Sequence, residues 1–532
     1  MFDCLSPEVT PLLALYAETH YRFRFFPFSL YYRREPEIIF DAPYRLEPGS
    51  PLPVTLIVKD ADRYPIKLTI ATVKISDGHE TTSHEITINA DVSASLWHHV
   101  FHIDVSNFPP GNLTVDATLT FHNGKRPRTV RNDNHPGLSH APLMVLKSEH
   151  PLPKLPGWYP GELHVHTSYG GDQVEFGAPL EALRETAQAI GLEWVALTDH
   201  SYNLDDYEDN YLQDDPDLLK WKKLHEHVEH LNRENHKVTL VPGEEVTCRS
   251  AAGRNVHLLV LGNDNFLKGS GDSAQKWFRT RSEHSVAEAL NLLSEAAFCT
   301  AAHPFAHVPV LERLLVRRGL WQETDLKLPR LDGWQVLNGK DDDGFRRGLE
   351  AWKRCLLAGE RKYICAGNDA HGNFNRFRLV KLPMIGLHEH RHHIFGRFMT
   401  FVKTEGKPTI QSIIAALKRG EAFISSGPAL ELTPEPYYDS EGGESRQRKL
   451  RVHYSSIPEF GAVKTLKIYF AEETDGEQHV ELAYGSQIQS NQSYNGEIIV
   501  DIPNARYARA ELTTNNVKGG EQFAFSNPVW FD

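Results

Sequence analysis

The first 150 residues carry short runs in which β-branched and polar residues alternate between turn residues. Examples are PLPVTLIVKDAD, YPIKLTIATVKI, HEITINADV and NLTVDATLTFHNG, separated by Gly, Pro, Asn and Asp. An alternation of period two buries one face of a strand and exposes the other. Because such strands recur along this stretch, residues 1–150 are predicted to form an N-terminal β-sandwich-like domain.

The pattern changes between residues 151 and 430, where short apolar runs alternate with helical periodicity. GELHVH is followed by PLEALRETAQAIG and LEWVALTDH, and the alternation continues to IQSIIAALKRG and EAFISSGP. This order predicts an α/β domain of parallel β/α units, arranged as a barrel or an open sheet. In both arrangements chemistry is found at the carboxyl ends of the strands.

Strand patterns return over residues 431–532, in KLRVHYSS, KTLKIYFAEE, GEIIVDIP and YARAELTT. They predict a C-terminal β domain that is smaller than the first. A chain of 532 residues accommodates this three-part division, since domains average about 150 residues.

Charge and cysteine content narrow the classes of function. Lys and Arg number 57 against 70 Asp and Glu, and the net charge of −13 argues against nucleic-acid or membrane partners. The five cysteines lie far apart without a CxxC pair, which suits a reducing compartment. The N-terminus shows no signal-peptide pattern, and no run reaches the roughly 18 apolar residues of a membrane span. A cytoplasmic protein is therefore expected, and an oligomer is left open.

Histidine is abundant, at 28 residues, and its placement along the chain separates two groups. Most histidines are interpreted as surface or packing residues. For a cluster near residue 390, a flexible loop is favoured and a loop metal site is the alternative. Six others stand at or near the predicted carboxyl ends of strands in the middle region, and three acids share that position. These nine candidate ligands are His164, His166, His200, His257, His303, His371, Asp172, Glu245 and Asp369.

The spacing of the first two histidines favours metal binding. His164 and His166 are two residues apart on one strand, so both imidazoles face the same side. One cation can take both rings, and a carboxylate can complete its shell. Nitrogen and oxygen ligands without thiolate suit zinc, manganese or iron. Unrelated hydrogen-bonding roles are the alternative for any single residue, but nine candidates at successive strand ends favour a metal centre.

Several segments resemble those of the PHP (polymerase and histidinol phosphatase) superfamily of metal-dependent hydrolases, in the same order along the chain. They are GELHVHTSYGGD, ALTDHS, VPGEEV, NVHLLVLG, TAAHPFA, WQVLNG and GNDAHG. The later segments FVKTEG and IQSIIAALKRGEAFISSGP also resemble the CehA/McbA-like branch, which includes carbaryl hydrolases. The resemblance implies a distorted (β/α)7 PHP-type barrel flanked by the two β-sandwich-like domains. It also implies two or three divalent metal ions (Mn, Fe or Zn).

The resemblance further implies how the ligands divide among the ions. One acidic residue, Glu245, bridges the first and second ions, because the family pattern is Pro-Gly-any-Glu, although Glu244 is its immediate neighbour. Carried over residue by residue, the first ion takes His164, His166, Glu245 and Asp369, the second takes Glu245, His257 and His303, and a third takes Asp172, His200 and His371.

Two ions about 3.5–4 Å apart can lower the pKa of a bridging water, so that a metal-bridging hydroxide attacks an ester. His200 or His371, if free of metal, can protonate the leaving group. Asp199 is expected to orient or hydrogen-bond a ligand rather than to bind metal. These three residues are the expected catalytic groups beside the metal ligands.

The substrate class rests on charge near the motifs. Arg249, Arg254 and Arg376 are candidate substrate-binding residues, and as a group they favour an anionic small molecule, although each alone also fits a surface role. A phosphoesterase is therefore favoured. A carbamate or carboxylic ester hydrolase is the alternative within enzymes. The alternative of another class is an inactive metal-stabilised scaffold whose β domains bind glycan or protein.

Overall fold

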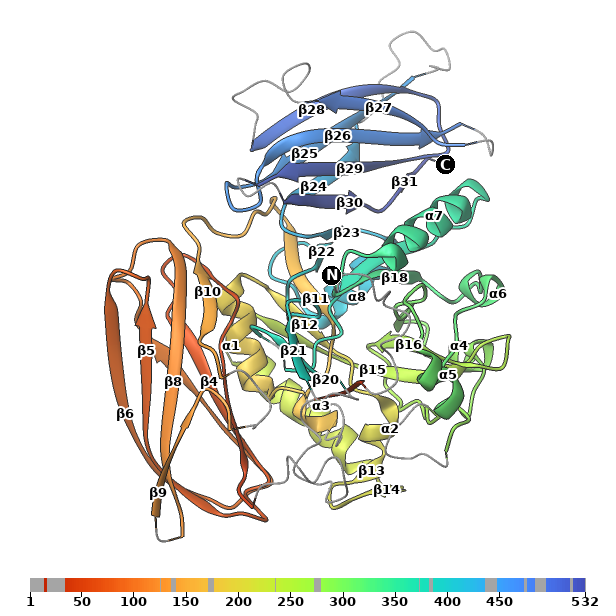
Figure 1. Ribbon diagram of the computed structural model, residues 1–532. Helices are drawn as coiled ribbons and strands as arrows, with labels where there is room; N and C mark the ends of the chain where they lie inside the picture. The colour runs from red at the N-terminus through yellow and green to blue at the C-terminus, as the bar shows by residue number, and fades with distance from the viewer. Residues whose placement is uncertain are drawn as a thin grey trace, which may run out of the picture.

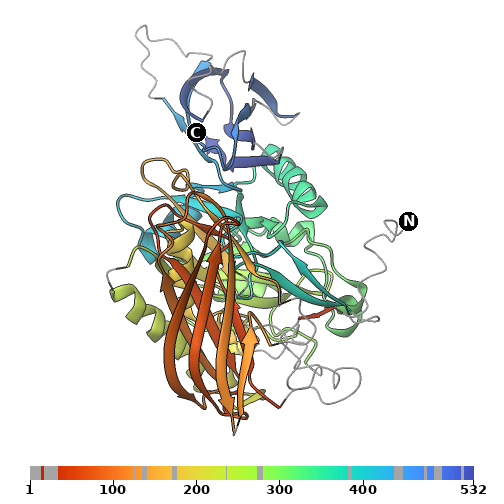
Figure 2. The same cartoon turned by 60° about the vertical axis from the view of Figure 1, so that its left-hand side comes forward.

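The structure is a computed structural model, and strands dominate it. Of the residues that it describes, 45% lie in strands and 17% in helices. The N-terminal strands lie along one side of the molecule and the C-terminal strands at one end, as both Figure 1 and Figure 2 show. The described residues are 14–16, 34–124, 126–134, 140–170, 177–234, 236–271, 279–372, 374–381, 386–435, 447–472, 476–483, 494–516 and 520–531.

Two sheets formed by residues 37–147 enclose one apolar core. Along one central strand buried positions alternate with half-exposed ones, as the period-two pattern predicts. Its residues Leu113, Val115 and Leu119 share a core with Val54 and Leu56 of the facing sheet. The larger sheet has the order β3 (Arg45–Leu46), β10 (Leu143–Lys147), β8 (Gly111–Asn123), β5 (Ile66–Ser76) and β6 (Thr81–Val92), with β9 (Arg126–Arg131) beside β8; the smaller has β2 (Glu37–Asp41), β4 (Leu52–Lys59) and β7 (Leu96–Ile103).

A mixed sheet of 14 strands connects the candidate site to the C-terminal strands. Neighbouring strands are parallel in two runs, β11–β12–β15 and β17–β18–β19, and the other neighbours are antiparallel. In order, the strands are β19 (Tyr363–Gly367), β18 (Gly333–Asn338), β17 (Phe298–Ala301), β16 (Asn255–Leu261), β15 (Thr239–Arg249), β12 (Trp194–Leu197), β11 (Trp158–Val165), β22 (Met399–Lys403), β23 (Ala422–Ser425), β30 (Glu521–Ser526), β29 (Tyr507–Asn515), β26 (Ala462–Ala471) and β27 (Gln478–Ala483), with β31 (Val529–Trp530) beside β29.

Three small sheets complete the strands of the described residues. One packs against the C-terminal part of the long sheet, and another pairs an N-terminal strand with strands that follow the last candidate ligand. They are β24 (Ala429–Pro434), β25 (Gln447–Ser455) and β28 (Asn495–Pro503); β1 (Ala14–Tyr16), β20 (Phe377–Lys381) and β21 (Gly386–His390); and β13 (Asp206–Tyr207) with β14 (Asn210–Asp214).

The helices begin and end at local capping signals. The last of them starts with a reciprocal box in which the side chains of Thr409 and Ser412 bond each other's backbone, and it ends at Gly420 with φ 72°. No helix of the described residues is long and apolar enough to cross a membrane. The helices are η5 (Ser168–Gly170), α1 (Leu180–Ile190), α2 (Ser201–Leu204), α3 (Leu219–Arg233), α4 (Val286–Leu292), α5 (Val310–Leu315), α6 (Glu323–Leu326), α7 (Asp343–Leu357) and α8 (Ile410–Arg419).

The prediction of a distorted (β/α)7 barrel is wrong, because the described residues form too many antiparallel pairs and too little helix. A β/α unit requires parallel neighbours joined by a helical crossover. Instead β15 and β16 pair antiparallel from Gly243↔Leu261 to Arg249↔Asn255, with a short turn between them. The next pair, β16 and β17, is also antiparallel, as is the contact of β11 with β22. The observed architecture is a strand-rich mixed sheet with helices beside it.

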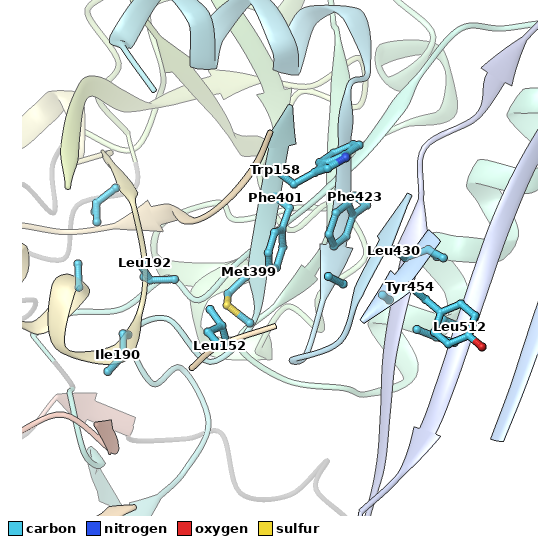
Figure 3. Close-up of a cluster of buried hydrophobic side chains, with 14 of the residues drawn as sticks. Leu152, Trp158, Ile190, Leu192, Met399, Phe401, Phe423, Leu430, Tyr454 and Leu512 are labelled. Carbon is cyan, nitrogen blue, oxygen red and sulfur yellow. The ribbon is translucent and has the colours of Figure 1, made fainter. Parts of the chain in front are cut away.

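A continuous apolar core holds β11 between the N-terminal and C-terminal parts of the molecule (Figure 3). Near the centre of Figure 3, Trp158 of β11 packs on Phe423, with ring centroids 4.9 Å apart, and Phe423 stacks on Phe401 at 4.4 Å. The same cluster extends to Tyr454 in the C-terminal strands. Burial of large aromatic side chains stabilises this junction strongly. The strand that carries His164 is therefore rigidly held.

Candidate metal centre

The structure brings eight of the nine predicted ligands to one buried place, and Asp172 lies outside the described residues. Each comes from a strand or from the residues just after one. Hydrogen bonds between these strand ends hold them together: His166 N donates to Ala370 O at 2.9 Å, and Glu245 N donates to Asp199 O at 2.9 Å. The positions are β11 for His164, the residue just after β11 for His166, the N-cap of α2 for His200, β15 for Glu245, β16 for His257, the segment after β17 for His303, and the segment after β19 for Asp369 and His371.

Glu245 is the centre of the cluster and is 1% exposed. Its Oε2 lies 3.3 Å from Nε2 of both His164 and His166 and 3.1 Å from Nδ1 of His200. Its Oε1 lies 2.5 Å from Nδ1 of His257 and 3.1 Å from Nε2 of His303. One carboxylate thus faces five imidazoles. Glu245 accordingly belongs to two of the groups of side chains that could hold an ion.

Asp369 faces the same pair of histidines from the other side. Its Oδ1 lies 3.4 Å from Nε2 of His164 and 3.2 Å from Nε2 of His166. Asp369 has φ 51° and His303 has φ 31°, a region that non-glycine residues rarely adopt. Such a conformation costs about 1–3 kcal/mol and is found chiefly at functional sites. The backbone strain supports a functional role for these two positions.

His164 and His371 each face an oxygen atom with Nδ1. Nδ1 of His164 lies 2.9 Å from Oε1 of Gln335, and Nδ1 of His371 lies 3.1 Å from the carbonyl oxygen of Asp369. Each of these Nδ1 atoms must carry the proton, which leaves the Nε2 lone pair available. The buried Nε2 atoms of His164 and His166 have no hydrogen-bond partner. Orphaned buried nitrogens beside two carboxylates fit a metal ion, because a cation satisfies both.

The charges of the cluster are strongly coupled. Burial opposes ionisation of Glu245, but the imidazoles around it, His257 foremost, hold its pKa well below the ordinary value. Burial acts to lower the pKa of His166, yet the nearby carboxylates of Asp369 and Glu245 outweigh burial and raise it well above the ordinary value. Burial, together with the charge of Arg318, lowers the pKa of His303 to about 4. Because an imidazole binds metal only in its neutral form, an ion at the cluster would have to displace a proton from His166, whereas the lowered pKa of His303 favours its neutral form.

Three overlapping groups have ligand atoms close enough to hold an ion. Within each group, the atoms lie within 4.8 Å of one another. His166, His200 and Glu245 each belong to two groups, so the groups form one connected centre. All donors are imidazole nitrogens or carboxylate oxygens, a set that suits zinc, manganese or iron. The groups are His166, His200 and His371; His164, His166, Glu245 and Asp369; and His200, Glu245 and His257.

Two acids near the cluster face elsewhere. Glu244 accepts hydrogen bonds from Ser201 Oγ at 3.1 Å and Trp221 Nε1 at 3.2 Å, and burial raises its pKa to about 8. Asp199 is fully buried and accepts from both the backbone N and Oγ1 of Thr167, each at 2.7 Å. The Asp199 carboxylate therefore shapes the turn that follows His166.

The structure places the three predicted substrate arginines with backbone carbonyls outside the cluster. Arg249 donates to Ser282 O at 2.9 Å, Arg254 donates to Arg313 O at 3.1 Å, and Arg376 donates to Ala141 O and Pro142 O.

Arg318 is the cation that does reach the cluster, and the sequence reasoning missed it. It is half-buried, and its Nη1 lies 3.1 Å from Nε2 of His257. Arg318 lies in an irregular segment beside Arg317, which has φ 59°. The hydrophobic pattern of such a segment does not predict where its side chains lie. Gln335 and Asn338 were also missed, although both stand in the WQVLNG motif.

Comparisons with known proteins assign no function to the chain. No family model and no curated protein match the chain. A glycosyl hydrolase family 2 member from Bacteroides cellulosilyticus is 11% identical, with 92% of this chain covering 63% of that chain at a TM-score of 0.17. A β-glucuronidase from Parabacteroides merdae is 8% identical, with 93% of this chain covering 77% of that chain at a TM-score of 0.16. Likenesses at such scores carry no argument about fold or function.

Proposed function

We propose that the chain is a metal-dependent hydrolase of ester bonds, with phosphoesters as the favoured substrates. One observation carries the proposal: a buried carboxylate, Glu245, faces five imidazoles, and two of the adjoining ring nitrogens have no hydrogen-bond partner. The motif resemblance to the PHP superfamily supports the same reaction class, independently of the strand order.

His164, His166, Glu245 and Asp369 would hold a first ion, and Glu245 would share a second with His257, His200 and His303. Two divalent ions, from Mn, Fe or Zn, would supply an activated water and polarise the scissile group when bound. His371 stacks on His166 with ring centroids 4.1 Å apart and an interplanar angle of 8°. This stacking, and the Asp369 carbonyl that holds His371 Nδ1, keep the Nε2 edge of His371 fixed.

The chain's own residues also exclude water and fix the approach to the cluster. His164, His166, His200 and Glu245 are each at most 5% exposed, so the surrounding polar groups act in a medium of low dielectric constant. Asp199, through Thr167, holds the turn after His166 in place. Preorganised groups of this kind lower the cost of reorganisation during the reaction.

Charge at the cluster favours an anionic substrate. The described cluster contributes two carboxylates, Glu245 and Asp369, and Asp172 would add a third negative charge. Two divalent ions would bring four positive charges, which three carboxylates and a bridging hydroxide would balance. Arg318 adds a further cation beside His257. A phosphate group would complement this cation better than a neutral carbamate would.

The proposal is tested by metal analysis and a substrate panel. Purified protein is expected to contain two or three Mn, Fe or Zn ions per chain and to hydrolyse p-nitrophenyl phosphate or bis-p-nitrophenyl phosphate faster than a naphthyl carbamate. Preference for the carbamate would favour the carbamate-hydrolase alternative. Protein that neither contains metal nor gains activity with added Mn²⁺, Fe²⁺ or Zn²⁺ would overturn the proposal. Metal without any turnover would favour the scaffold alternative.

A further inference from the structure

Two amide side chains connect a histidine and an aspartate of the metal centre. Oε1 of Gln335 lies 2.9 Å from Nδ1 of His164, and Nε2 of Gln335 donates to Oδ1 of Asn338 at 2.9 Å. Nδ2 of Asn338 donates to Oδ2 of Asp369 at 3.2 Å. Gln335 is 0% exposed and lies on β18, and Asn338 ends that strand. A continuous chain of hydrogen bonds therefore runs from one candidate ligand to the other.

This chain has a direction that the carboxylate imposes. An ionised carboxylate only accepts hydrogen bonds, so Asn338 must present its NH₂ group to Asp369. The Asn338 oxygen then faces Gln335, which must donate a hydrogen bond to it from its own NH₂ group. The Gln335 oxygen consequently faces His164, whose Nδ1 must carry the proton. The opposite orientation would place two acceptors against each other at Asp369, so neither amide can be flipped.

We propose that Gln335 and Asn338 are positioning residues that form an amide relay, through which Asp369 sets the ring orientation and tautomer of His164. The proposal rests on the proposed function, because the Nε2 lone pair of His164 is the one that would meet the ion. The relay links two ligands of the same ion, so each holds the other in its binding state. Partners of this kind commonly contribute 10- to 100-fold to metal affinity.

The side chains of His164 and Gln335 are closely packed, so no other polar group has room to replace the Gln335 amide. A Cβ added at Gly367 would lie 2.8 Å from Cβ of His164 and 3.0 Å from Nε2 of Gln335, so the backbone there already contacts both side chains. With Gln335 fully buried, bulk water cannot replace its amide. The relay is therefore the structural means of fixing the His164 tautomer.

The relay is tested by the affinity of the metal-free protein for Mn²⁺. The protein is titrated with Mn²⁺, and the free Mn²⁺ is measured by electron paramagnetic resonance. Gln335→Met is expected to weaken binding by about 10- to 100-fold. Gln335→Glu keeps an acceptor for His164 and is expected to bind Mn²⁺ more tightly than Gln335→Met. A packing role predicts the reverse order, since an apolar side chain suits a buried position better than a carboxylate does. The reverse order, or equal affinities, would overturn the relay.

Asn338→Ala provides a second test at a half-buried position that tolerates change better. The double variant Gln335→Met with Asn338→Ala is expected to lose less affinity than the two single losses combined, because both act through one chain. Fully additive losses would contradict the relay.

The tautomer of His164 can be read without any metal, which separates failure of the relay from failure of the proposed function. In metal-free protein with ¹⁵N-labelled imidazoles, the His164 signals are identified by their absence in His164→Gln. At a pH at which the ring is neutral, the wild-type His164 should carry its proton on Nδ1, and Asn338→Ala should show a mixture of tautomers. A wild-type mixture would overturn the relay. A wild-type Nδ1 tautomer in a protein that binds neither Mn²⁺ nor Zn²⁺ would overturn only the hydrolase proposal.

Discussion

Glu244 and Glu245 are adjacent on β15, yet their side chains point to opposite faces of the strand and contact different residues. Alternation along the strand sends Glu245 among the imidazoles and Glu244 toward Ser201, Trp221 and Leu267. The pair supplies a matched experiment, because both residues are buried and differ by one position.

Glu245→Gln is expected to weaken Mn²⁺ binding by about 100-fold or more, because it removes the negative charge that faces five imidazoles. Glu244→Gln should leave Mn²⁺ affinity nearly unchanged. It should lower the free energy of unfolding by about 1–3 kcal/mol, since an amide nitrogen would face a donor. Equilibrium binding and urea unfolding measure the two effects. Loss of metal in Glu244→Gln alone would mean that the bridging ligand has been misidentified.

Arg318 gives a test of substrate charge. Replacement by Met is expected to lower kcat/KM for p-nitrophenyl phosphate by about 10- to 100-fold, as a hydrogen bond to a charged group contributes about 1.5–3 kcal/mol. Turnover of a neutral ester should change little. Arg346→Met, on the exposed face of α7, serves as the control. An equal loss on charged and neutral substrates would show that Arg318 acts on the cluster and not on the substrate.

The candidate site could be predicted largely from placement along the chain. The spacing of His164 and His166 predicts that both imidazoles face one side, and GNDAHG places Asp369 just after β19. VPGEEV lies inside β15, which continues to Arg249, so Glu245 reaches the cluster from within a strand and not from its end. Arg318 and the Gln335–Asn338 pair could not be found in this way. Their roles depend on contacts between segments distant in sequence, and arginine and amide side chains are common on surfaces.

At the scale of elements, the N-terminal sandwich meets α1 through histidines on either side of two carboxylates. Glu185 of α1 lies 3.2 Å from Nε2 of His102 on β7 and 3.7 Å from Nε2 of His236. Glu181, one turn earlier, lies between His98 and His227, at 3.4 Å and 3.1 Å. These four histidines were interpreted as surface or packing residues, and their placement at this contact gives them a specific structural part.

The contact predicts a pH dependence of stability. The close contact with His236, helped by His102 and opposed by burial, lowers the pKa of Glu185 to about 2. A lowered pKa in the folded state means that ionised Glu185 favours folding; its contribution is complete above the ordinary pKa and is lost as pH falls from about 4.5 to 2. Glu185→Gln should lower the free energy of unfolding by about 1–2 kcal/mol at pH 5.5 and by little at pH 2.5.

Urea unfolding at both pH values measures this difference, and Glu229→Gln on the exposed face of α3 is the control. A loss of the same size at pH 2.5 and pH 5.5 would contradict the assignment of the charge effect to Glu185.

The existence of the helices and strands was easier to predict than their connection. Periodicity marked α1, α3, α7 and α8 and most site strands, because each has a clear apolar face. The barrel failed at β15 and β16, where RSAAGRN between two apolar strands is a hairpin connection and contains no helix. Gly253, with φ 70°, closes that turn. Whether two strands run parallel or antiparallel depends on such connections and on tertiary contacts. The hydrophobic pattern within each strand gives little information about either.

At the scale of the whole molecule, Arg45 joins three distant parts of the chain. It is 1% exposed; it forms an ion pair with Glu47, donates to Glu459 at 2.9 Å, and donates to the carbonyls of His150 and Ile190. Arg45→Met is expected to lower the free energy of unfolding by about 3–5 kcal/mol, because it leaves buried acceptors without their cation. Arg131→Met, which breaks the exposed pair with Asp116, should change the free energy of unfolding far less.

Urea unfolding compares the two arginine variants. Equal, small effects would mean that the parts of the molecule are held together by apolar packing alone, without help from this buried cation.

The pairing of β23 with β30 constrains how the molecule can move. Phe423 and Ile424 face Ser526 and Phe525 across this ladder, and Asn527 bonds both the N and O atoms of Ile364 in β19. Swinging the C-terminal strands away from the cluster would break these buried hydrogen bonds together. If the proposed hydrolase reaction takes place at the cluster, the C-terminal strands are expected to stay in place during substrate entry and product exit, and any opening motion would involve other segments.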